Sequence, residues 1–132
     1  MENTGFQVFC DKQCVISLPR LRDRNDRKYY IYKMLFNYFV YIVTNTYRTT
    51  IYIGVTNNIQ RRISQHYFDS QNGGKSFAGK YNCYYLVYYE GFQSPNEAIA
   101  REKELKKWRR EKKNKLITDF NPKWESLNNQ VI

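Results

Sequence analysis

The fold is decided by two stretches, Phe39-Val40-Tyr41-Ile42-Val43 and Ile51-Tyr52-Ile53-Gly54-Val55. Both are rich in β-branched and aromatic residues, which favour strands over helices. The polar segment between them, residues 45–48, is short enough for a hairpin turn. The sequence therefore predicts an antiparallel hairpin. Alternate residues of a strand point to the same face of a sheet. Phe39, Tyr41 and Val43 therefore share one face of the first strand, and Tyr52 and Gly54 share one face of the second.

The residues after the hairpin predict helices and one further strand. Thr56, Asn57 or Asn58 can cap a first helix, whose expected buried stripe is Ile59, Ile63 and Tyr67. Residues 69–79 predict a loop, and residues 83–89 predict a third strand.

A second helix is expected to begin at Ser94-Pro95-Asn96-Glu97, where serine caps, proline fits the first turn and glutamate completes a capping box. It is expected to run to about residue 110, with a shorter helix over residues 112–118. The order strand, strand, helix, strand, helix, helix predicts an α+β domain with a small three-stranded, mainly antiparallel sheet flanked by helices.

The chain of 132 residues has room for one ordinary domain. We expect that domain to span residues 36–130. Residues 1–35 show no clean helical or strand period and are expected to be a poorly ordered N-terminal extension. Two alternatives remain open for this segment: that Met34 is the true start, or that the charged run over residues 20–28 is a basic arm that contacts phosphates.

Composition favours a polyanionic partner. The chain has 22 Lys and Arg against 12 Asp and Glu, a formal net charge of +10. Nucleic acid is the first candidate and an anionic membrane surface the second. No apolar run is long enough for a membrane span, and no secretory signal is recognisable, so a cytoplasmic protein is expected. Three cysteines in a chain without a recognisable signal argue against a disulfide framework. The spacing of Cys10 and Cys14 suits two zinc ligands, but a closed site needs four and His66 is the only histidine, so free thiols are expected.

Three groups of residues could carry chemistry. Glu102 falls within the apolar stripe of the second helix, where a carboxylate needs a metal ion or an arginine beside it; a salt bridge at the helix edge is the alternative. Arg62 and His66, four residues apart, share one helix face and suit phosphate binding and proton transfer; a solvated arginine and a partly packed histidine are the alternative. Tyr41 and Tyr52 on adjacent strands are, by themselves, more typical of a core.

A basic stretch follows over residues 101–115, with nine Lys or Arg against three Glu. Positive charge at a helix C-terminus stabilises any helix, but the charge of the whole chain favours a phosphate-contacting surface. The predicted nucleic-acid-binding residues are Lys106, Lys107, Arg109, Arg110, Lys112 and Lys113.

In order and spacing, these residues resemble the GIY-YIG nuclease superfamily, specifically its small single-domain bacterial members. Phe39-Val40-Tyr41 stands where the family has Gly-Ile-Tyr, with the tyrosine kept, and Tyr52-Ile53-Gly54 follows after ten residues. Arg62 and His66 come at the matching distances beyond. Residues 97–108 look like the second helix of that subfamily and residues 121–124 like its C-terminal signature. The resemblance covers about 95 residues.

The resemblance implies a metal-dependent DNA endonuclease that hydrolyses a phosphodiester bond, with DNA repair or recombination as its setting. Glu102 would hold one divalent cation, Mg²⁺ or Mn²⁺. Arg62 would bind a non-bridging oxygen. Tyr41, with Tyr52 beside it, would orient and deprotonate the attacking water. Because a free phenol has a pKa of about 10, either Arg62 and the metal lower that pKa or His66 accepts the proton.

Two further residues receive roles from the resemblance. Asn121 would hydrogen-bond within the catalytic site and tie down the C-terminal segment. Gly54 would be structural and would let backbone or phosphate approach closely.

Two other classes of function compete with an active enzyme. A non-catalytic nucleic-acid-binding module on the same fold would use residues 106–115, but it needs no carboxylate at position 102. A membrane-surface protein would need large exposed apolar residues on a basic helix, and residues 101–115 offer only Leu105 and Trp108. DNA is therefore the expected partner.

Overall fold

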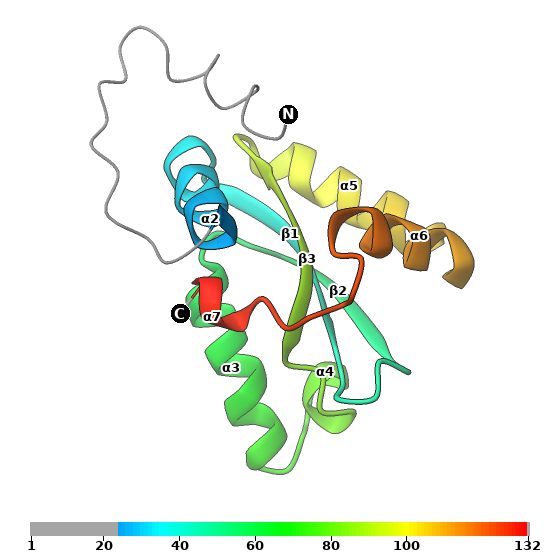
Figure 1. Ribbon diagram of the computed structural model, residues 1–132. Helices are drawn as coiled ribbons and strands as arrows, with labels where there is room; N and C mark the ends of the chain where they lie inside the picture. Colours follow the sequence, from blue (N-terminus) through cyan, green and yellow to red (C-terminus); the bar gives the residue numbers. More distant parts are fainter. Residues whose placement is uncertain (1–23, 132) are drawn as a thin grey trace, which may run out of the picture.

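The computed structural model describes residues 24–131, and side chains from Tyr29 onward. Figure 1 shows the elements in chain order: α2 (Arg24–Leu35), β1 (Tyr38–Thr44), β2 (Ile51–Thr56), α3 (Ile59–Gln71), α4 (Phe77–Lys80), β3 (Tyr85–Phe92), α5 (Pro95–Lys107), α6 (Arg110–Phe120) and α7 (Asn128–Val131). No helix within these residues combines the length and apolarity that crossing a membrane requires.

The sheet has three strands in the order β2-β1-β3, and both pairings are antiparallel. The predicted hairpin and the predicted fold class are therefore confirmed. One irregularity interrupts the β1–β3 ladder: Ile42 pairs with Tyr88 while Val43 pairs with Leu86, so Val87 is an extra residue. Such a bulge lets two neighbouring side chains face the same side, and Val87 and Tyr88 do pack into one core.

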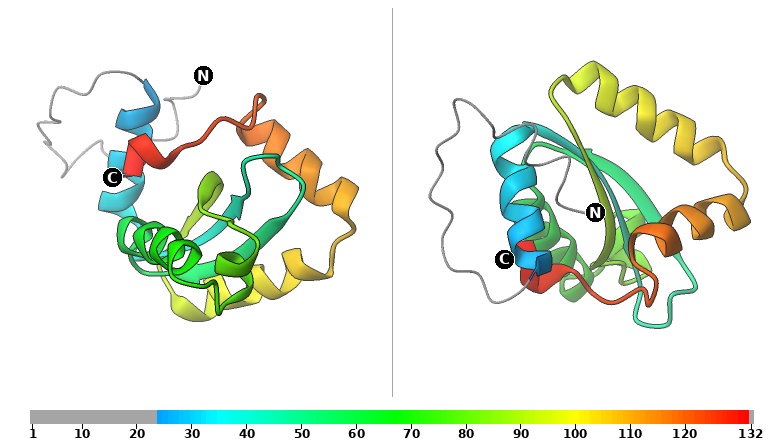
Figure 2. Two further views of the ribbon diagram at one scale, coloured as in Figure 1. Left: turned by 90° about the horizontal axis from the view of Figure 1, so that it is seen from below. Right: turned by 45° about the horizontal axis from the view of Figure 1, so that its top comes forward.

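Helices cover both faces of the sheet, which gives three layers. Figure 2 shows α2 and α3 on one side and α5 and α6 on the other. The first core joins Phe39, Tyr41 and Val43 to α3, as alternation predicts. The second core joins the opposite face of the sheet to Ala98 and Leu105 of α5 and to Ile117 of α6. Each core buries apolar surface, the main source of stability in such a domain.

Several boundaries differ from the expected ones. α5 ends at Lys107 because Trp108 adopts an extended backbone (ψ 152°), and α6 begins already at Arg110. The expected loop over residues 69–79 contains the end of α3 and the single turn of α4. Tyr67, expected in the buried stripe, is 49% exposed. His66 is buried in its place, because α3 turns the side of residues 59, 63 and 66 toward the sheet.

The segment before the sheet also differs from expectation. Arg24–Leu35 is a helix rather than a poorly ordered tail, and Met34 lies within it. Tyr29 is buried and its ring meets the Tyr89 ring edge-on at 5.5 Å between centroids. Single aromatic side chains hold this helix against the domain. Its sequence has no amphipathic period, so the pattern of residues does not predict a helix here. Residues 1–23, with Cys10, Cys14 and the start of the charged run, lie outside the described residues.

Candidate active site

The candidate site is built around the Tyr41 hydroxyl, which crosses the edge strand at Gly54. Tyr41 lies in the middle of β1 and pairs with Gly54 of β2. A Cβ atom at position 54 would lie 2.6 Å from the hydroxyl oxygen of Tyr41, which is closer than Cβ atoms come to atoms that they are not bonded to. A glycine is therefore needed for the Tyr41 ring to lie over β2 and reach α3. Gly54 therefore has a structural role in this structure: it leaves room for the Tyr41 ring.

α3 brings Arg62 and His66 to this hydroxyl. The helix begins at Ile59, with the Asn58 side chain as its cap. Arg62 Nε donates to the Tyr41 hydroxyl at 3.0 Å, and His66 Nε2 lies 2.8 Å from the same oxygen. One turn of helix separates the two residues, so the shared face expected from their spacing places both on one phenol. Three of the predicted site residues are thus in direct contact.

Burial sets the charges of this cluster. It raises the pKa of Tyr41 to about 12, although the hydrogen bond from Arg62 acts in the opposite direction. Burial, aided by the charge of Arg62, lowers the pKa of His66 to about 4. The hydrogen bond to Tyr41 raises the pKa of Arg62 above its ordinary value. At neutral pH the phenol and the imidazole are therefore uncharged and the guanidinium is charged. A neutral Nε2 can then accept a hydrogen bond from the Tyr41 hydroxyl, while the oxygen of that hydroxyl accepts one from Arg62.

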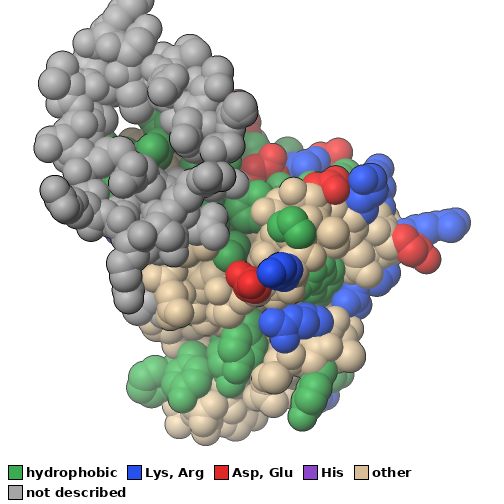
Figure 3. Space-filling model, in the orientation of Figure 1, with side chains coloured by type: hydrophobic (Ala, Val, Ile, Leu, Met, Phe, Trp, Pro, Cys, Tyr) green, Lys and Arg blue, Asp and Glu red, His purple; other side chains and the backbone are tan. Residues whose placement is uncertain are grey.

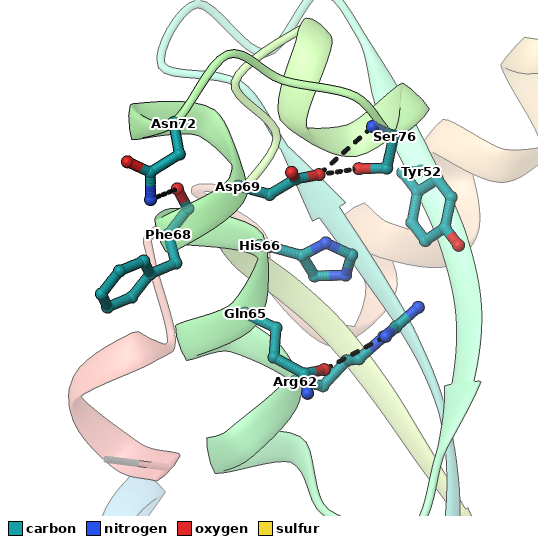
Figure 4. A pocket seen from close by; sticks show the side chains of 8 residues that line it. All are labelled: Tyr52, Arg62, Gln65, His66, Phe68, Asp69, Asn72 and Ser76. Carbon is teal, nitrogen blue, oxygen red and sulfur yellow. Dashed lines mark hydrogen bonds between the residues drawn. The ribbon is translucent and has the colours of Figure 1, made fainter.

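An open pocket of about 480 Å³ lies in front of this cluster. Figure 4 shows the side chains that line it: Tyr52, Arg62, Gln65, His66, Phe68, Asp69, Asn72 and Ser76. Tyr52 is half-buried, and its ring meets the His66 ring edge-on at 5.3 Å between centroids. Tyr41 is 0% exposed. The two predicted tyrosines therefore occupy different positions: Tyr52 faces the pocket, and Tyr41 lies behind the pocket wall.

Two side-chain contacts in this pocket were not anticipated from the sequence. Gln65 Oε1 accepts from Arg62 Nη1 at 3.1 Å, a contact that the three-residue spacing could have indicated. The Asp69 carboxylate accepts hydrogen bonds from the backbone and the hydroxyl of Ser76. This second contact holds α4 against the end of α3. No local period predicts this contact, because Asp69 and Ser76 are separated by the loop between α3 and α4, whose path the sequence pattern does not give.

Glu102 approaches from the helix on the other face of the sheet. α5 packs against β1 and β2, and the Glu102 side chain is only 19% exposed. Its carboxylate is close enough to Tyr41 to contribute to the raised pKa of that phenol, after burial as the main cause. Its Oε2 lies 3.0 Å from Lys106 Nζ, so the alternative of a salt bridge is also present here. Ile99, expected beside it on the apolar stripe, is 41% exposed.

The donor set can be tested against a divalent cation. Among residues 24–131 there is no group of three or more His, Cys, Asp or Glu side chains that could enclose a metal ion. Mg²⁺ does not need one, since it commonly keeps several waters and binds through one or two carboxylates plus substrate phosphates. Glu102, with one oxygen outside its contact with Lys106, fits this mode of binding.

Asn121 does not join the pocket at Tyr52 and Arg62. It is buried, and its Nδ2 donates to the carbonyl oxygens of Val87 at 3.2 Å and Glu125 at 2.8 Å. Its contacts therefore tie the C-terminal segment to the bulged residue of β3. This matches the tying part of its expected role. Its place near the reacting groups is not matched, since Asn121 lines a different cavity, beside Tyr89.

The predicted nucleic-acid-binding residues lie at the junction of α5 and α6, and Figure 3 shows Lys and Arg gathered on that side of the molecule. Three of them have structural contacts, among them Lys106 with Glu102. Arg110 donates to the backbone carbonyl of Thr49 at 3.0 Å, and Lys112 Nζ lies 4.1 Å from the centre of the Trp108 ring. Lys107 and Arg109 are exposed. The surface is thus basic, but some of its cationic side chains contact the domain instead of extending freely into solvent.

The fold and the site define a small α+β domain whose tyrosine, arginine and histidine side chains meet at the edge of an antiparallel sheet. The family model described as GIY-YIG catalytic domain matches residues 37–115. The chain belongs to the GIY-YIG family, a family of nucleases, as its motifs predict.

Relatives come from both archaea and bacteria. A UPF0213 protein of Natronomonas pharaonis is 35% identical over 86 residues, which are 65% of this chain and 96% of that protein. UPF0213 proteins of Staphylococcus haemolyticus and Clostridium perfringens are each 34% identical over 82 residues, 62% of this chain, and cover 95% and 85% of their own lengths. No solved structure matches the chain.

Proposed function

We propose that this protein is a metal-dependent endonuclease that hydrolyses a phosphodiester bond in DNA. The observation that carries the proposal is the Tyr41 hydroxyl, held between Arg62 and His66 behind an open pocket. This arrangement gives a charged, oriented guanidinium with a neutral imidazole beside it. Binding one phosphate oxygen and accepting one proton are the two tasks that phosphodiester hydrolysis asks of side chains.

Arg62 would bind a non-bridging oxygen of the scissile phosphate. Its Nε is fixed on Tyr41 and its Nη1 on Gln65, which points the guanidinium along the pocket wall. A fixed cation stabilises the charge that grows on the phosphoryl oxygens without having to reorganise during the reaction. Tyr41 acts on Arg62 as a positioning residue.

Tyr52 and His66 would handle the attacking water. Tyr52 lines the pocket, so its side chain can orient the water. With its pKa raised to about 12, Tyr41 is a poor base in this environment. His66, with a pKa of about 4, is neutral at physiological pH. Its Nε2 already accepts from Tyr41, so the proton of the water would reach His66 through the Tyr41 hydroxyl, which would take that proton and give its own to Nε2. Glu102 would hold Mg²⁺ or Mn²⁺, and the bound ion would supply Lewis-acid stabilisation of the leaving oxygen.

The test is cleavage of labelled DNA duplex, flap, junction and single strand with Mg²⁺ or Mn²⁺. Glu102→Gln should lower the rate by at least about 100-fold, since even residues behind a metal ligand commonly contribute 10- to 100-fold. Glu104→Gln is the matched control, because Glu104 lies on the same helix, is exposed and pairs with Arg101. Cleavage that survives Glu102→Gln would refute the site. Tight binding with no cleavage on any substrate would favour the non-catalytic binding module.

The pH dependence of the rate separates the two candidate bases. With His66 as acceptor the rate should be flat between pH 6 and pH 9, because the imidazole is already neutral there. With a tyrosinate as acceptor it should rise about tenfold per pH unit across the same range.

A further inference from the structure

Three aromatic rings lead outward from the candidate site along β2 and α4. Tyr52 lines the pocket, and Phe77 stacks on it with an angle of 28° and 6.3 Å between ring centroids. Tyr81 follows, 4.8 Å from Phe77. Phe77 is 52% exposed and Tyr81 is 44% exposed. These aromatic side chains form one row and leave flat apolar surface in contact with water. Contiguous exposed apolar surface of this kind is typical of a binding site.

The surroundings of this row are cationic. Lys80 Nζ lies 5.6 Å from the centre of the Tyr81 ring, and Lys75 is exposed in the loop before α4. A second open pocket of about 450 Å³ adjoins the first through Arg62 and Gln65 and adds Arg61 to the wall. Among the described residues, Asp69 is the one carboxylate that lines either pocket, and it accepts hydrogen bonds from Ser76. Pockets with positive side chains and little negative charge, and a row of flat rings that starts at Tyr52 in the pocket wall, are together complementary to a nucleic-acid strand.

We propose that Tyr52, Phe77 and Tyr81 form a stacking platform for unpaired nucleotides beside the scissile phosphate. The preferred substrate would then be DNA with an unpaired segment, such as a single strand or an overhang, rather than blunt duplex. This inference rests on the proposed function for the position of the scissile phosphate. Bases inside a duplex keep their faces stacked on one another, so only unpaired bases can use the rings, as proteins that bind single strands do.

The asymmetry of this surface supports the choice of a nucleic acid over a protein partner. Arg61 and Arg62 line the two pockets, whereas Phe77 and Tyr81 continue the row outward from Tyr52 at α4. Figure 4 shows Ser76, the cap of α4, at the opposite end of the pocket from Arg62. A strand that has its phosphate on Arg62 would carry its next bases toward Phe77. The Asp69–Ser76 contact fixes α4 in place, so the rings are held before any substrate binds, and little ordering of α4 opposes binding.

Binding in the presence of EDTA tests the platform separately from cleavage. Fluorescence anisotropy would compare a labelled single-stranded 12-mer with its blunt duplex, for the wild type, Phe77→Ala and Tyr81→Ala. Since stacking on one ring commonly contributes about 1–3 kcal/mol, each variant should bind the single strand about 5- to 150-fold more weakly. Duplex affinity should change by less than about twofold. Tyr47→Ala is the matched control: Tyr47 is 82% exposed, on the turn between β1 and β2, and is not one of the three rings of the row.

A second pair of variants guards against loss of folding. Phe77→Trp keeps a flat ring and should retain the single-strand affinity, whereas Phe77→Leu keeps apolar bulk without a ring and should lose it. Equal affinity of the wild type for both DNAs, or equal losses in Phe77→Leu and Phe77→Trp, would overturn the proposal. A dimer in sedimentation equilibrium that Phe77→Ala converts to monomer, with DNA affinity unchanged, would overturn it too, since the rings would then bind a second copy.

The two proposals fail in different ways. Ring-dependent binding of single strands without any Glu102-dependent cleavage would leave the platform standing and remove the nuclease. Cleavage that depends on Glu102 but is equal on both DNAs, and is unchanged by Phe77→Ala, would leave the nuclease standing and remove the platform.

Discussion

The buried imidazole of His66 should make the stability of this protein fall between pH 7 and pH 5. Its folded-state pKa is about 4, against about 6.5 in an unfolded chain. Between those values the unfolded chain binds more protons than the folded one, so the free energy of unfolding rises with pH. The stabilising contribution of the neutral imidazole is complete above about pH 6.5 and is lost progressively down to about pH 4.

The size of the effect follows from the two pKa values. Linkage gives a loss of about 2 kcal/mol from pH 7 to pH 5, and about 3 kcal/mol by pH 4. Urea unfolding at pH 7 and pH 5 would measure it, with His66→Gln as the control. Glutamine can still accept a hydrogen bond from Tyr41 but does not titrate. The difference between wild type and variant therefore removes the contribution of the carboxyl groups.

NMR can measure the pKa of His66 independently, because the chain has a single histidine and its imidazole signal needs no further assignment. The imidazole signal of the folded protein should titrate with a midpoint near pH 4. A midpoint at or above 6.5, or equal pH dependence in wild type and His66→Gln, would refute the buried neutral imidazole. With a midpoint at or above 6.5, the flat rate expected between pH 6 and pH 9 would be replaced by a fall toward pH 6.

Three further changes have defined outcomes. Gly54→Ala places a methyl group against the Tyr41 ring and should cost about 1–3 kcal/mol by urea unfolding; a loss below 0.5 kcal/mol would show that the ring has room to move. Asn121→Ala leaves the Val87 carbonyl without its partner and should cost about 1–3 kcal/mol, with the His66 titration unchanged. Tyr29→Ala removes a buried ring and should cost about 3–5 kcal/mol; a negligible thermal shift would show that α2 is not part of the fold.

Local periodicity explains why much of the site could be predicted from the sequence. Alternation along two strands places Tyr41 and Tyr52 on one face, and a spacing of four residues places Arg62 and His66 on one side of a helix. The hairpin register then sets Tyr41 opposite Gly54. Each of these relations involves neighbours in the chain or a pair of strands joined by a short turn, where geometry leaves few choices.

The remaining features depend on where an element lies relative to the sheet, which no local pattern encodes. Both tyrosines share a face, yet only Tyr41 is fully buried, because β1 is the central strand and β2 the edge. Tyr67 and His66 are adjacent in the chain, and the angle at which α3 lies on the sheet decides that the histidine turns inward. The row from Tyr52 to Phe77 depends on α4, a single turn in a segment rich in glycine and serine.

The use of a phenol to hold Arg62 has a consequence for phosphate binding. A carboxylate in the place of Tyr41 would hold the guanidinium as firmly, but it would also neutralise the charge that a phosphate needs. A buried phenol with a raised pKa accepts the Nε hydrogen bond and stays uncharged. His66 completes the hydrogen bonding of that phenol and, with its lowered pKa, adds no charge either. The positive charge of the cluster is thus left on the guanidinium at the pocket wall, where the proposed hydrolysis would develop charge on a phosphate.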